Sequence, residues 1–78
     1  MAYPTLKRIN SAIRQAGIPL ELERGEGYHY FIYDRPDINV YETESVYVPY
    51  TSIYTMAEWV REAQYALATI EAVIERRS

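Results

Sequence analysis

Met56–Arg77, with the sequence MAEWVREAQYALATIEAVIERR, is the stretch that decides how the rest of the chain must fold. Read at intervals of three and four residues, it gives one apolar stripe about six turns long. Thr55 and Glu58 stand in the S/T-x-x-E/Q relation of a capping box, which predicts where the helix begins. We therefore expect a long amphipathic helix lying on a surface that the upstream residues build. Its apolar stripe consists of Met56, Trp59, Val60, Ala63, Ala66, Leu67, Ile70, Val73 and Ile74.

Upstream, the first element is a second, shorter amphipathic helix. Apolar residues recur at helical spacing from Leu6 to Ala16, and Thr5 is placed to cap the start of that helix. Gly17 followed by Pro19 ends it.

Three strands are predicted between the two helices. Residues 20–24 alternate with period two, residues 28–33 are β-prone throughout, and a Gly-Glu-Gly turn joins them as a hairpin. Residues 34–37 form a second turn, and residues 44–48 read as the third strand, ended by Pro49. The prediction is an α+β domain in the order α-β-β-β-α, a three-stranded antiparallel sheet with two helices packed on one face.

Length and composition place the chain among small single domains. Its 78 residues form one domain, 1–78, and 49% of them are hydrophobic, which suffices for one core. There is no cysteine, and the single histidine excludes any site that needs two imidazoles. No apolar run is long enough for a signal peptide or a membrane span, so we expect a cytoplasmic protein. No motif for a cofactor is present in the sequence, and we expect the protein to require none.

Charge is distributed unevenly along the chain, although its net value is only −3. Residues 20–55 hold seven acidic side chains against two arginines, and most of the nine tyrosines lie in the same region. Tyrosines on a sheet face could stack on nucleic-acid bases, but neighbouring glutamates would repel phosphates. Tyrosines among carboxylates suit a protein partner with a basic surface.

Other candidate sites carry less information. His29 has no nucleophile at a diagnostic spacing, so the sequence predicts no catalytic residue and favours a structural histidine. The acidic residues between positions 34 and 44 do not match the calcium-binding loop, so no metal site is predicted. The basic face formed by Lys7, Arg8 and Arg14 is either a solvated surface or a phosphate-binding patch.

Three stretches of the sequence together carry a resemblance to a known group. Residues 25–31 (GEGYHYF), residues 41–48 (YETESVYV) and the Glu58-Trp59 pair look like the glycine turn, strands and tryptophan-bearing helix of a group of short phage and prophage proteins. The resemblance implies phage origin and a bacterial host cell. In size and character the chain is also similar to anti-CRISPR proteins, which implies inhibition of a host complex by covering its surface.

These observations lead to one preferred function and two alternatives. The preferred function is a non-enzymatic phage-type protein that binds and occludes a host protein complex, with a CRISPR effector subunit as the partner. One alternative is a module that forms homodimers through Tyr65, Ala68 and Ala72, and the other is a small nucleic-acid-binding regulator. The predicted partner-binding residues are Glu21, Glu23, Glu26, Tyr28, Tyr30, Tyr33, Asp34, Glu42, Glu44 and Tyr47.

Overall fold

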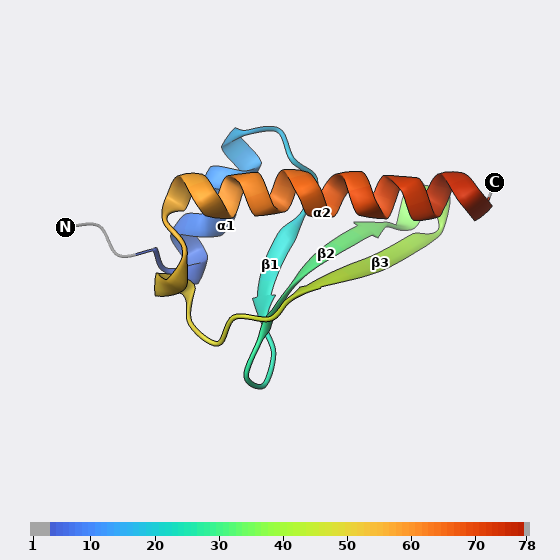
Figure 1. Ribbon diagram of the computed structural model, residues 1–78. Coiled ribbons are helices and arrows are strands. Elements are labelled where there is room, and N and C mark those ends of the chain that lie inside the picture. Colours follow the sequence, from blue (N-terminus) through green and yellow to red (C-terminus); the bar gives the residue numbers. More distant parts are fainter. Residues whose placement is uncertain (1–3, 78) are drawn as a thin grey trace.

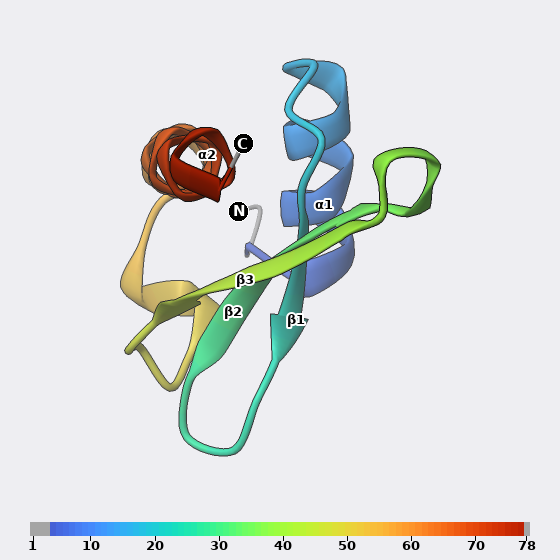
Figure 2. The ribbon, with the colours of Figure 1, turned by 90° about the vertical axis from the view of Figure 1, so that its right-hand side faces the viewer.

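The computed structural model describes residues 4–77, which form two helices and one three-stranded antiparallel sheet (Figure 1). Both helices lie on the same side of the sheet, and the longer one runs along the hairpin made by the second and third strands (Figures 1 and 2). This arrangement confirms the predicted α+β fold and its element order. The elements are α1 (Leu6–Gln15), β1 (Glu21–Arg24), β2 (His29–Arg35), β3 (Val40–Val46) and α2 (Met56–Arg77), with short 3-10 turns at Pro36–Ile38 and Thr51–Ile53.

Local signals in the sequence set both ends of α1. At the start, the Thr5 hydroxyl accepts the backbone N–H of Arg8 at 3.2 Å. At the end, the N–H of Ile18 donates to the carbonyl of Ile13 at 3.1 Å, and Gly17 adopts a φ of 75°. This is a Schellman motif, which needs a residue that tolerates the left-handed region. The predicted cap and stop of this helix are confirmed.

The capping box at the start of α2 is also confirmed. The backbone N–H of Thr55 donates to Glu58 Oε1 at 2.9 Å, and the N–H of Glu58 donates to Thr55 Oγ1 at 3.1 Å. Each side chain thus satisfies an amide that the helix itself leaves without a partner. The hydrogen bond from the Thr55 N–H is the main reason that the pKa of Glu58 lies below its ordinary value.

Trp59 is the centre of the core between α2 and the sheet. Its side chain is fully buried, and its indole N–H donates to the carbonyl of Thr51 at 2.8 Å. The rings of Tyr54, His29 and Phe31 contact it edge-on, with centroids 5.1, 5.9 and 6.3 Å away. The apolar stripe of α2 is buried or half-buried along its length.

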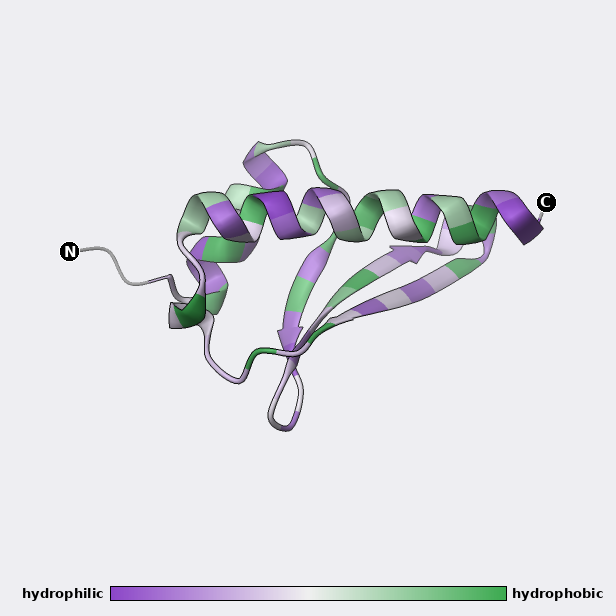
Figure 3. Ribbon diagram, in the orientation of Figure 1, coloured by the Kyte–Doolittle hydropathy of each residue, from purple (hydrophilic) through white to green (hydrophobic). Residues whose placement is uncertain are grey.

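Strand register separates a covered face of the sheet from an open one. Leu22 and Phe31 lie opposite each other on the covered face, whereas Glu23, Tyr30 and Ser45 form a cross-strand row on the open face. In Figure 3 β1 carries a hydrophobic band between hydrophilic ones, whereas β3 is hydrophilic over most of its length.

The start of the third strand differs from the prediction. β3 begins at Val40 rather than at residue 44, and it pairs with β2 as far as Arg35. Two acidic residues inside the strand, Glu42 and Glu44, interrupt the apolar pattern that marks a half-buried strand. Cross-strand pairing with β2, which the pattern of a single segment does not record, sets where β3 begins.

The outer edge of β1 is closed by a side chain from α1. The Asn10 side chain donates from Nδ2 to the Leu22 carbonyl at 3.0 Å, and its Oδ1 accepts the Leu22 N–H at 2.6 Å. One amide group therefore satisfies both backbone groups that Leu22 would offer to another strand. This is a way of protecting a sheet edge from pairing with other chains.

Replacing Asn10 with alanine should lower the free energy of unfolding by about 1–2 kcal/mol, because two hydrogen bonds to the Leu22 backbone are lost. Urea denaturation measures this change. Gln15→Ala is the matched control, since Gln15 is an exposed amide side chain in the same helix and its removal should cost within about 0.5 kcal/mol. Equal destabilisation by the two changes would contradict a closing role for Asn10.

The capping box should contribute stability that depends on pH. Because folding lowers the pKa of Glu58 from 4.5, its ionised form stabilises the fold above that value. The contribution is lost as the pH falls through the lower folded value. The melting temperature of Glu58→Gln should therefore be below that of the wild type at pH 7, and the two should converge once the pH falls below the folded pKa of Glu58. Glu71→Gln, in the middle of α2, controls for the loss of one negative charge.

Candidate functional site

Three tyrosines form a cluster on the open face, at the end of the sheet near the β1–β2 turn. The ring centroid of Tyr28 lies 5.9 Å from that of Tyr30 and 6.2 Å from that of Tyr47, in tilted arrangements. Tyr28 and Tyr30 are half-buried, whereas Tyr47 is 84% exposed. The cluster therefore presents aromatic surface and phenolic hydroxyls to solvent, ready for contact with another molecule.

Gly25 makes room for the cluster. Its backbone N–H donates to the Tyr28 carbonyl at 2.8 Å in the β1–β2 turn, so the two residues face each other across the hairpin. A Cβ atom on Gly25 would lie only 2.5 Å from Cε1 of the Tyr28 ring. The ring can occupy its position over the turn only because residue 25 has no side chain.

Carboxylates share this face with the tyrosines, and Glu23 lies directly opposite Tyr30. Glu21, Glu23 and Asp34 lie on the open side of their strands, and Glu26 is exposed in the turn. The register places no lysine or arginine on the open side of the described strands. The open face, which includes Glu21, Glu23, Tyr28, Tyr30, Asp34, Tyr41, Thr43, Ser45 and Tyr47, therefore combines aromatic and negative groups.

Three of the ten predicted partner-binding residues lie elsewhere. Tyr33 is buried on the covered face beside Phe31, because two-residue alternation separates it from Tyr28 and Tyr30. Glu42 and Glu44 also face the helix side, where they are half-buried. The ten residues thus do not form one surface.

The predicted set also missed Tyr41, an exposed tyrosine of the open face. Tyr41 is 61% exposed and lies opposite Asp34 on β2. Its position in the strand, two residues before Thr43 and four before Ser45, gives it the same orientation as these open-face residues. The sequence would have revealed this if the third strand had been predicted to start before residue 44.

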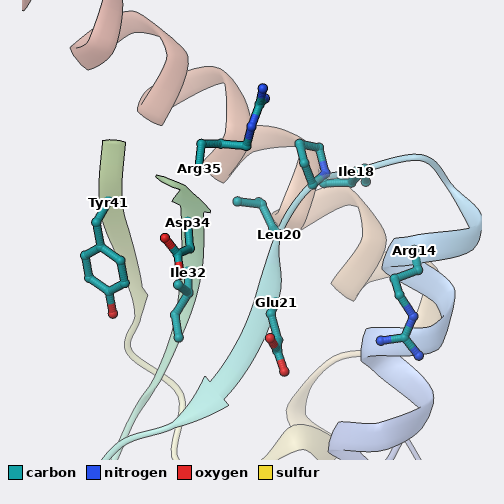
Figure 4. A pocket seen from close by; sticks show the side chains of 9 residues that line it. Arg14, Ile18, Leu20, Glu21, Ile32, Asp34, Arg35 and Tyr41 are labelled. Atoms are coloured by element: carbon teal, nitrogen blue, oxygen red, sulfur yellow. The ribbon is translucent and has the colours of Figure 1, made fainter. Parts of the chain in front are cut away.

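A pocket of about 440 Å³ adjoins the open face where β2 extends past β1 (Figure 4). Side chains of both charges line it, including Arg14 from α1 and Asp34 from β2. In Figure 4 the Arg35 side chain points away from Asp34 and Tyr41. This agrees with its bidentate hydrogen bonds to Asp37, which occupy the guanidinium.

His29 is part of the core. Its side chain is fully buried, and Nδ1 lies 2.8 Å from the carbonyl of Val48, to which it donates in the Nδ1–H tautomer. Nε2 is buried without a partner among the described residues. The hydrogen bond ties β2 to the segment that follows β3. A substrate in solvent has no access to this imidazole.

The acidic residues between positions 34 and 44 do not gather around a cation. Asp37 binds Arg35, whose hydrogen bond lowers the pKa of that carboxyl, and Glu42 forms an ion pair with Arg77 at the end of α2. Within residues 4–77 no three histidine, cysteine or acidic side chains are placed to hold a metal ion.

The remaining predicted surfaces lie on the helices. Tyr65, Ala68 and Ala72 are all exposed on α2, and Tyr65 is 62% exposed. The side chains of Lys7, Arg8 and Arg14 are exposed on α1. Neither set lies on the open face of the sheet.

Comparisons of the chain with family models, with curated proteins and with solved structures find no match. Neither helix of the described residues has the combination of length and apolar character needed to span a membrane.

Gly25→Ala should displace the Tyr28 ring from the cluster, because the added Cβ would overlap it. Nuclear Overhauser contacts from Tyr28 to Tyr30 and Tyr47 should weaken, while stability falls by about 1 kcal/mol or less, because the half-buried ring can move. Gly27→Ala is the control. It introduces strain at a φ of 79° but meets no atom within 4 Å, so it should destabilise the chain and leave the ring contacts intact. Unchanged contacts in Gly25→Ala would contradict this account of the turn.

Proposed function

We propose that the chain is a non-enzymatic protein-binding module whose contact surface is the open face of the sheet. The observation that carries this proposal is the solvent-facing cluster of Tyr28, Tyr30 and Tyr47, on a face where the register places carboxylates and no lysine or arginine of the described strands. Tyrosine is enriched at the centres of protein interfaces, where its ring is buried and its hydroxyl forms a hydrogen bond. The carboxylates favour a partner surface with positive charge.

The chemistry of the open face supports a protein partner over a nucleic acid. Aromatic surfaces that bind single strands track the phosphate backbone with lysine and arginine. Here Glu23 lies directly opposite Tyr30, and Glu21 and Asp34 lie on the same face, where these charges repel phosphates. Burial of His29 adds support for a role without acid–base catalysis, because it removes the chain's single imidazole from the surface.

The narrower form of the proposal is a phage-type inhibitor that covers a host complex, with a CRISPR effector as the partner. It rests on the resemblance of the turn, strand and helix motifs in the sequence. A net charge of −3 is modest, which favours steric occlusion over imitation of DNA. Self-association through Tyr65, Ala68 and Ala72 is the competing proposal, since all three side chains are exposed on α2.

Tyr47→Ala should weaken partner binding about tenfold or more, as expected for an aromatic residue at the centre of an interface. The partner is obtained by affinity capture from a lysate of bacteria that carry CRISPR systems, and binding is then measured with the purified complex. For the inhibitor form, expression of the chain should restore plaque formation by a phage that the CRISPR system targets. The Tyr28→Ala, Tyr47→Ala double variant should not.

Tyr65→Ala is the matched control, because it removes an exposed tyrosine from the helix layer. Loss of binding in this variant with full binding by Tyr47→Ala would place the contact on α2 and overturn the proposal. Light scattering of the free chain after gel filtration distinguishes self-association, which predicts a dimer that Tyr65→Ala dissociates.

A further inference from the structure

We propose that the outer edge of β3 binds an extended segment of a partner protein as a fourth, antiparallel strand, and that this segment carries basic side chains at alternate positions. This edge is separate from the open face. It offers backbone groups and glutamates of the covered side, whereas the open face offers tyrosine rings.

The two edges of the sheet differ in whether their backbone groups are already hydrogen-bonded. The strand order β1-β2-β3 leaves β1 and β3 each with one side free of another strand. On β1, the Asn10 amide occupies both backbone groups of Leu22. Among the described residues, no side chain or loop backbone forms a hydrogen bond with the backbone of residues 41–45 of β3. An unprotected edge of this length is a template for strand addition.

The register identifies the backbone groups that β3 would offer. Leu22 directs its N–H and C=O away from β2, so Phe31, which lies opposite Leu22, directs its own groups toward β3. Phe31 lies opposite Glu44, whose backbone groups therefore point toward β2. Since these directions alternate along a strand, the groups that point outward belong to Tyr41, Thr43 and Ser45.

The side chains along this edge determine which segment it fits. Glu42 and Glu44 would lie in the pairs of an added strand that are not hydrogen-bonded, where facing side chains approach most closely. Arg77 already pairs with Glu42. Glu44 and, on the adjacent helix, Glu62 have no hydrogen-bond or ion-pair partner in the described part of the chain. Lysine or arginine in the added strand would supply that partner.

A groove between β3 and α2 would receive these basic side chains of the added strand. Its volume is about 120 Å³, and its lining is mainly polar. It is lined by Glu44, Ser45, Val46, Glu62, Tyr65, Ala66 and Thr69.

Charge disfavours a second copy of the chain as the occupant. Two β3 strands paired antiparallel over their full length, centred on Thr43, would set Glu42 of each copy opposite Glu44 of the other. Like charges directly opposite each other destabilise strand pairing. A partner strand with positive charge at these positions avoids this repulsion.

The probe for this edge is a blocked heptapeptide of alternating threonine and lysine, acetyl-TKTKTKT-amide, titrated into ¹⁵N-labelled protein. At saturation, amide hydrogen exchange at Tyr41, Thr43 and Ser45 should slow at least about tenfold, because outward-facing N–H groups become hydrogen-bonded. Two control peptides separate the contribution of lysine spacing from that of the backbone hydrogen bonds. One has the same composition without alternation, KKTTTTK, and the other has methylated backbone nitrogens on the edge-facing side. Both should bind several-fold more weakly.

Glu44→Gln should weaken binding of the alternating peptide by about two- to fivefold, the range expected for one solvent-accessible ion pair. Glu21→Gln, on the open face, is the matched control and should leave the affinity unchanged, which separates this edge from the surface of the proposed function.

Three results would overturn the proposal. The first is equal binding of the methylated or scrambled peptide, and the second is the absence of amide protection in β3 at millimolar peptide. The third is concentration-dependent protection of the same amides without peptide, which would assign the edge to a second copy of the chain.

Discussion

Burial of the Trp59 ring fixes the position of the long helix on the sheet, and the other elements depend on that position. The indole is held by a hydrogen bond to the Thr51 carbonyl and by edge contacts with Tyr54, His29 and Phe31. These contacts join α2 to β2 and to the connection between β3 and α2. Because large aromatic side chains dominate core energetics, this one residue secures the sheet layer, the helix layer and the loop that links them.

The parts of the fold that could be predicted from the sequence are those with local causes. Thr55 and Glu58 lie three residues apart, and Gly17 lies directly after the helix that it ends, so their chemistry can be recognised without tertiary information. The Asn10 amide acts on Leu22 across two elements. No spacing rule connects an asparagine on a helix face with a particular strand edge, and this contact was therefore not predicted.

In the candidate site, too, single residues could be placed from the sequence only where the cause is local. Two-residue alternation places Tyr28 and Tyr30 together and sends Tyr33 to the core, which can be deduced once the strand is known. The positions of Glu42 and Glu44 are harder to deduce from the sequence, because acidic residues on the helix-facing side of a strand contradict the usual pattern. They are tolerated because β3 lies at the edge of the sheet, where Arg77 reaches one carboxylate and the other borders a polar groove.

Closure of the β1 edge by Asn10 sets the stoichiometry of any assembly that uses strand pairing. An open-ended filament requires two complementary free edges on each subunit, so that every added molecule creates a new attachment point. Within residues 4–77 β3 offers the unprotected edge, because Asn10 blocks the Leu22 backbone of β1, and one pairing event occupies that edge. Strand pairing through β3 would therefore limit such a complex to two components and disfavour continued polymerisation through the sheet.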